Sequence, residues 1–189
     1  MPKQNLNKLE GVKKEINIII EQLNSKTCCF SGHRPKSLPW GSDEQDERCV
    51  KMKGKLKEEI IKAIKSGYDT FLCGMALGFD MIVAEMILEL KENDSFKHIK
   101  LIGALPCKNQ ERLWKEGEKF RYHNLLAKLD GTRCIYDNYV GAKCMLERNK
   151  FMVNNSSLLI ALFNGTSGGT EKTIKYAQKQ GIDIVIIVP

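Results

Sequence analysis

The sequence predicts an α/β fold in which a mostly parallel sheet carries helices on both faces, with an additional helix at the N-terminus. Short apolar runs alternate with helical segments from residue 27 onward, and right-handed crossovers place a helix between successive parallel strands. Three of the apolar runs end in glycine-containing turns. We therefore expect an N-terminal helical extension at residues 1–26 and one α/β domain at residues 27–189.

The extension is expected to be helical because its apolar residues alternate at spacings of three and four. These residues are Leu9, Val12, Ile16, Ile19 and Leu23. Two interpretations stay open: the apolar seam packs on the domain's own surface, or it meets a partner helix. We expect a homodimer that forms mainly through the α/β domain, with this helix contributing.

The elements of the domain follow from apolar periodicity and from the residues that start and stop helices. Residues 27–31 form the first strand, which Gly32 ends. The elements that follow are expected in this order: a helix at 46–66, a strand at 68–73, a helix at 81–91, a strand at 98–105 closed by Pro106, a helix at 109–129, an edge strand at 133–136, a helix at 144–153, a strand at 158–163, a helix opening at Thr170, and a last strand at 183–188.

The turn after the strand at 158–163 predicts an anion site. That apolar run is too short for a helix and fits a strand buried on both faces. Gly168 and Gly169 let the backbone turn sharply, and Thr170 opens a helix. The free N–H groups and the positive dipole end of such a helix favour an anion, typically a phosphate. The alternative is an ordinary turn in which the glycines serve packing alone.

Two further turns are expected to meet this one. His33 and Arg34 follow the first strand and suit an anionic ligand, whereas Asp80 either faces the ligand or caps its own helix. Ligands bind beyond the carboxyl ends of parallel strands where the strand order reverses, so a central first strand brings the three turns to one cleft, with the loop at 36–45 as its rim. The expected ligand-binding residues are Gly32, His33, Arg34, Gly74, Met75, Gly78, Asp80, Asn164, Gly168, Gly169 and Thr170.

Composition narrows the class of protein. The chain has 189 residues and is 42% hydrophobic, enough to bury one core. Its N-terminus lacks the apolar core of a signal peptide, so we expect a cytoplasmic protein without membrane contact. The cysteines are odd in number, without a C-x-x-C spacing, which favours reduced thiols. No His, Cys and Asp group has metal-ligand spacing, and we expect no metal site.

The formal net charge of +7 raises the question of nucleic acid. The distribution of the lysines argues against nucleic acid as the main partner. They lie beside glutamates on helix-like segments, and no basic run is interleaved with aromatic residues. A solvated helix surface explains most of this charge.

Several segments resemble the YpsA-like branch of the SLOG superfamily over residues 27–189. They are Phe30-Ser-Gly-His-Arg-Pro35, Gly74-Met-Ala-Leu-Gly-Phe-Asp80 with Glu85, Pro106-Cys-Lys-Asn-Gln110, Cys144-Met-Leu-Glu-Arg-Asn149 and Ser167-Gly-Gly-Thr170. SLOG domains are Rossmann-like modules, and they include the Lonely Guy phosphoribohydrolases, DprA DNA-processing proteins and sensors of NAD-derived nucleotides. The resemblance implies a nucleotide or NAD-derived ligand.

The Lonely Guy enzymes provide a test at the level of residues. Their catalytic arginine lies in M-H-E-R-K, and Arg148 is its counterpart here by resemblance. Their catalytic glutamate lies in P-G-G-x-G-T-x-E-E, whereas Glu171 follows Thr170 directly. A shift of one position along a helix rotates a side chain by about 100° about the helix axis. Glu171 is therefore displaced from the catalytic face. The hydrolase hypothesis stays open because Glu85 or Asp80 can substitute as the carboxylate that glycosidic cleavage requires.

We therefore expect a Rossmann-like SLOG domain that binds a nucleotide or nucleotide-derived phosphate ligand in a sensing or regulatory role. The first alternative is a nucleoside-monophosphate N-glycosidase that uses Arg148 with Glu85 or Glu171. The second is DprA-like nucleic-acid binding.

Overall fold

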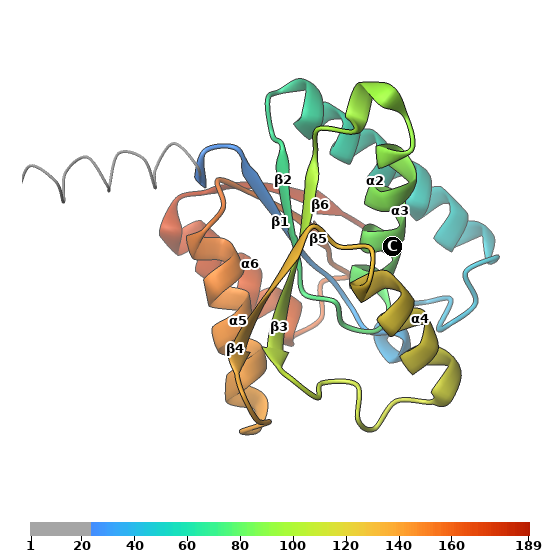
Figure 1. Ribbon diagram of the computed structural model, residues 1–189, viewed down its shortest axis with the longest axis vertical. Helices are drawn as coiled ribbons and strands as arrows, with labels where there is room; N and C mark the ends of the chain where they lie inside the picture. Colours follow the sequence, from blue (N-terminus) through green and yellow to red (C-terminus); the bar gives the residue numbers. More distant parts are fainter. Residues whose placement is uncertain (1–23) are drawn as a thin grey trace, which may run out of the picture.

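The computed structural model describes residues 24–189. Its centre is a six-stranded parallel sheet in the order β4-β3-β2-β1-β5-β6 (Figure 1). The strands are β1 (Thr27–Ser31), β2 (Thr70–Cys73), β3 (Lys100–Cys107), β4 (Gly131–Tyr136), β5 (Leu158–Leu162) and β6 (Asp183–Ile187). The predicted α/β class with a parallel sheet is confirmed. The apolar seam at residues 9–23 lies outside the described residues.

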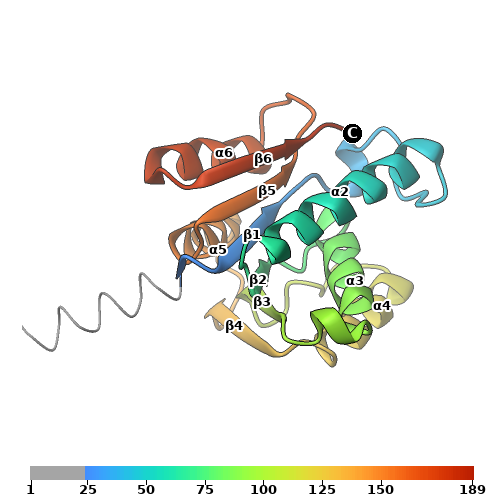
Figure 2. The same cartoon turned by 90° about the horizontal axis from the view of Figure 1, so that it is seen from above.

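Helices cover both faces of the sheet (Figures 1 and 2). One face carries α2 (Glu47–Lys65), α3 (Phe79–Lys91) and α4 (Glu116–Leu126), and the other carries α5 (Ala142–Asn154) and α6 (Gly169–Gln180). Two short 3₁₀ helices, η1 (Pro35–Ser37) and η2 (Asp94–Phe96), lie in the connections. Within the described residues, no helix has the length and apolar character needed to cross a membrane.

The change of face follows from the handedness of the crossovers. From β1 to β4 the chain moves outward in one direction, and its three connecting helices lie on one face. It then returns through α5 to β5 on the other side of β1, and a right-handed connection in the reverse direction requires the opposite face. The strand order therefore reverses between β1 and β5, as the sequence predicted for a central first strand.

The core explains why β1 and β5 read as unbroken apolar runs. Every residue of both strands is buried, as expected for parallel strands covered on both faces. Phe30 of β1 stacks on Phe71 of β2, with ring centroids 6.1 Å apart, and this pair lies in the larger of two apolar clusters. The smaller cluster packs β5 against α5 and α6 through Met152, Leu159 and Ile174. Both clusters hold the carboxyl ends of β1 and β5 in fixed positions.

Several predicted boundaries differ from those of the structure, and two of the differences have a clear structural cause. Pro106 does not close the third strand, because β3 continues to Cys107, which pairs with Tyr136 of the edge strand β4. The helix expected at 109–129 begins only at Glu116. The residues before it form turns, and the Gln110 side chain is buried there, donating from Nε2 to the Met75 carbonyl oxygen at 2.9 Å. A tertiary contact of this kind overrides helical periodicity.

Candidate functional site

A pocket of about 410 Å³ opens at the carboxyl ends of β1 and β5, where the strand order reverses. Its walls come from the residues after β1, the start of α3, the inner face of α5 and the turn that opens α6. The lining residues are Phe30, Ser31, Gly32, His33, Arg34, Lys36, Ser37, Ala76, Asp80, Met145, Arg148, Asn149, Met152, Thr166, Ser167, Gly168, Gly169 and Thr170. The three turns predicted to converge do so. Open α/β sheets bind ligands at this position.

The start of α6 presents backbone donors to the pocket. Gly168 is the N-cap and has no side chain to bond the first N–H groups, which an α-helix leaves without intrahelical acceptors. A Cβ atom added at Gly168 or Gly169 would meet nothing within 4 Å. Packing therefore does not require these glycines. They leave open space above a positive helix end.

Three cationic side chains line the pocket. Arg34 and Lys36 are exposed and come from the segment after β1. Arg148 comes from the middle of α5 and is only 5% exposed. Its Nε and Nη1 atoms are buried and have no hydrogen-bond partner in the described structure. A buried guanidinium with unpaired donors carries a large desolvation cost, which an anion in the pocket would offset.

Arg148 lies against the turn after β2. A Cβ atom at Gly74 would sit 1.6 Å from Arg148 Nη1 and 2.6 Å from Asp80 Oδ2, so only glycine leaves room for the guanidinium. Met75, the next residue, has a positive φ of 54° and is fully buried. Its carbonyl oxygen is held by Gln110. Gly74 and Met75 thus shape the wall behind the pocket without lining it.

Asp80 is the carboxylate within the lining. It does not cap α3: the N-cap is Gly78, and Asp80 Oδ2 accepts from the backbone N–H of Ala76 at 3.2 Å, upstream of the helix. Arg148 Nη1 lies 3.6 Å from the same oxygen. Burial raises the pKa of Asp80, and the nearby positive charge of Arg148 opposes that rise. The pocket therefore keeps an excess of positive charge.

His33 and Asn164 tie two of the turns together. His33 Nε2 accepts from the Asn164 backbone N–H at 3.2 Å, and its ring stacks on Phe163. Burial lowers the pKa of His33, so the neutral ring that accepts this bond is favoured. Asn164 is outside the lining, but its side chain joins two lining residues, donating to the Ser37 carbonyl oxygen at 3.0 Å and accepting from Thr166. Asn164 therefore acts on the shape of the site.

Two other glycines permit close packing of the turns. A Cβ at Gly32 would overlap the Phe79 ring at 2.3 Å, and one at Gly78, where φ is 90°, would meet the His33 carbonyl oxygen at 2.8 Å. Gly32 lines the pocket, whereas Gly78 lies just outside it.

Neither glutamate considered for catalysis lines the pocket. Both carboxylate oxygens of Glu85 accept from Arg121 of α4, with Oε1 2.7 Å from Arg121 Nε. Glu171 accepts from Ser167 Oγ at 2.9 Å and pairs with Lys175 at 2.6 Å. Lys175 and then Ser167 lower the pKa of Glu171, which suits an ion pair better than proton transfer near neutral pH.

Lining residues that the sequence did not single out include Asn149, one position after Arg148. Its Nδ2 donates to Thr173 Oγ1 at 2.8 Å and fastens α5 to α6. The helical spacing of Met145, Arg148, Asn149 and Met152 marks one face of α5, and that periodicity was the available signal. Lys36 carried no such signal.

The family model for YpsA, described as the YspA SLOG family, matches residues 28–188. The chain belongs to this family. The resemblance noted in the sequence is thus confirmed, and the pocket described above is the pocket of a YspA SLOG domain.

Curated relatives match most of this SLOG chain. A UPF0398 protein of Brevibacillus brevis is 29% identical over 157 residues, covering 82% of both chains. The UPF0398 protein YpsA of Bacillus subtilis is 26% identical, covering 78% of this chain and 81% of its own. The SPbeta prophage-derived protein YoqJ of the same organism is 29% identical, covering 69% of this chain and 82% of its own.

Solved structures share the SLOG fold. DNA processing protein A of Streptococcus pneumoniae superposes with a TM-score of 0.55 and 15% identity, covering 87% of this chain and 50% of its own. The Helicobacter pylori protein, whose structure is described by its single-stranded DNA binding mode, gives a TM-score of 0.57 and 16% identity, covering 88% of this chain. The chain spans half of the first protein and 66% of the second.

Proposed function

We propose that this SLOG domain binds the phosphate group of a nucleotide or nucleotide-derived ligand, in a sensing or regulatory role. The observation that carries the proposal is Arg148: a guanidinium 5% exposed, with Nε and Nη1 unpaired, in the lining that also holds the start of α6. A helix N-terminus and a guanidinium supply dipolar and charge-assisted donors to one anion. Arg34 and Lys36 add positive charge at the rim.

The space suits a small ligand. A volume of about 410 Å³ falls within the range of cofactor sites. The phosphate is assigned to the α6 end because that wall has backbone donors and open space above Gly168 and Gly169. The rest of the ligand then extends toward Met145 and Ala76.

A regulatory role is favoured over hydrolysis by the positions of the carboxylates. Glu85 is held by Arg121 and Glu171 by Lys175, outside the lining. Asp80 alone of the three candidate carboxylates lines the pocket, and its raised pKa is the one feature that favours the glycosidase alternative.

Single-stranded DNA is the second candidate ligand, because the DprA structures share the fold and one is described by that binding mode. The pocket and its cations suit a single phosphate as well as a strand. Calorimetry with AMP, ADP-ribose, NAD and a single-stranded oligonucleotide tests the proposal. We expect saturable binding of at least one of the three nucleotides. Binding of the oligonucleotide alone contradicts it.

A further inference from the structure

Arg34 and Lys36 belong to a segment that we call the strap, residues 34–46, between β1 and α2. It consists of η1 and successive turns, in which the N–H groups of Ser37 and Gly41 donate to carbonyl oxygens three residues earlier. Leu38 and Trp40 are its buried anchors, 7% and 5% exposed. The strap brings two exposed cationic side chains, Arg34 and Lys36, to the pocket rim.

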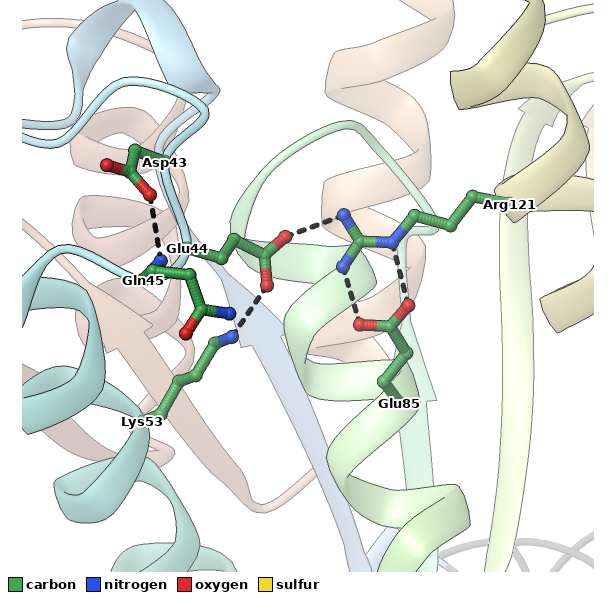
Figure 3. A network of polar contacts seen from close by, with 6 residues as sticks. All are labelled: Asp43, Glu44, Gln45, Lys53, Glu85 and Arg121. Atoms are coloured by element: carbon green, nitrogen blue, oxygen red, sulfur yellow. Dashed lines mark hydrogen bonds and ion pairs between the residues drawn. The ribbon is translucent and has the colours of Figure 1, made fainter.

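The far end of the strap is held by charge. Glu44 Oε1 accepts from Arg121 Nη1 at 2.6 Å, and Glu44 Oε2 pairs with Lys53 Nζ of α2 at 2.7 Å (Figure 3). Arg121 uses its other nitrogens on Glu85 of α3. One guanidinium on α4 therefore links the strap to α3. Its side chain is 34% exposed, so solvent screens the contacts only in part.

Besides these ion pairs, the strap is held by its two buried anchors and by Asn164, which donates to the Ser37 carbonyl oxygen. A cavity of about 110 Å³ lies beneath it, lined by Leu38, Trp40, Glu44, Met81 and Arg121 among others. Without Arg121, the carboxylates of Glu44 and Glu85 would face each other with Lys53 as their remaining cation. Their repulsion would push Glu44 away from α3.

We propose that Arg121 is a positioning residue for the ligand site: by joining Glu44 to Glu85 it fixes the strap so that Arg34 and Lys36 reach the pocket. Arg121 itself lies outside the pocket lining. The proposal assigns a role to Glu85 as well, as the anchor for Arg121. It rests on the proposed phosphate-binding function.

A double-mutant cycle tests it, with AMP as the probe in calorimetry. We expect Arg121→Gln to weaken AMP binding at least about threefold in the wild-type background and less than about twofold in the Arg34→Ala background. The two losses should differ because the effects of coupled residues are not additive. Arg121→Lys, which keeps the charge, should recover part of the loss. The matched control is Lys57→Gln, which removes the exposed Lys57–Glu89 pair between α2 and α3 without touching the strap, and it should leave affinity unchanged.

A second readout needs no ligand. Trypsin cleavage after Lys36 should be faster in Arg121→Gln than in the wild type or Lys57→Gln, because the strap is less firmly held. An unchanged cleavage rate, or equal AMP losses with and without Arg34, overturns the inference. If AMP, ADP-ribose and NAD all fail to bind the wild type, the proposed function fails, and the cleavage rate still decides whether Arg121 anchors the strap.

Discussion

Arg148 Nη1 lies 3.6 Å from Asp80 Oδ2, so the two buried charges attract each other without forming a hydrogen bond. The guanidinium thus remains under-satisfied, with Nε and Nη1 unpaired. Burial lowers the pKa of Arg148 while it raises that of Asp80. The proposed phosphate would supply the acceptors that Arg148 lacks.

The first prediction concerns Arg148→Met. We expect the melting temperature of the ligand-free protein to fall, because the substitution leaves the buried carboxylate of Asp80 without its partner cation. The stabilisation by AMP, ADP-ribose or NAD should disappear. Thermal unfolding with and without nucleotide measures both effects. A retained nucleotide shift would exclude Arg148 from the site.

The second prediction concerns Arg34, which is exposed at the rim. Arg34→Ala should weaken nucleotide binding by about 1.5 to 3 kcal/mol, the range for a hydrogen bond to a charged group. Circular dichroism should show an unchanged fold, since the side chain is exposed. Calorimetry at two salt concentrations gives the affinity, and equal affinity in mutant and wild type contradicts the assignment.

The third prediction is an acid sensitivity due to His33. Burial lowers its pKa from the ordinary value of 6.5, so the folded state favours the neutral ring. The stability that His33 contributes is complete above pH 6.5 and is lost as the pH falls through the lowered pKa. In His33→Gln, whose amide oxygen can accept from Asn164 N–H, this loss should be absent. Denaturant unfolding of both proteins between pH 7 and 5 gives the slope of the free energy of unfolding against pH. Parallel slopes exclude His33 as the cause of the acid sensitivity.

The fourth prediction separates binding from hydrolysis. Incubation with purine monophosphates should release no free base, because Glu85 and Glu171 are engaged by Arg121 and Lys175. Chromatography of the reaction measures release. Rapid release that Asp80→Asn abolishes would establish the glycosidase alternative instead.

The fifth prediction is a homodimer, formed mainly through the α/β domain. Deleting residues 1–26 should leave a dimer in light scattering, with a lower association constant if the apolar seam contributes. A monomeric wild-type protein at micromolar concentration would exclude this assembly.

The sequence predicted the sheet and, on the condition that β1 is central, the meeting of the three turns, because apolar runs and glycines report burial and sharp turns locally. It failed where contacts are tertiary. Gln110 holds Met75 from 35 residues away, and Arg121 holds Glu85 from 36 residues away. Neither pairing has a local signature, so the start of α4 was misplaced and Glu85 was assigned to a site that it does not line.

The most direct test of phosphate binding at the start of α6 compares two glycines. Gly169→Ala adds a methyl group in open space at the start of α6, and the matched control Gly117→Ala adds one in open space at the start of α4, outside the lining. Both variants should be as stable as wild type or up to about 1 kcal/mol more stable. Calorimetry with the tightest-binding nucleotide should show that Gly169→Ala loses at least tenfold in affinity, about 1.4 kcal/mol. The affinity of Gly117→Ala should be unchanged. Equal affinities in both variants would contradict the proposed site.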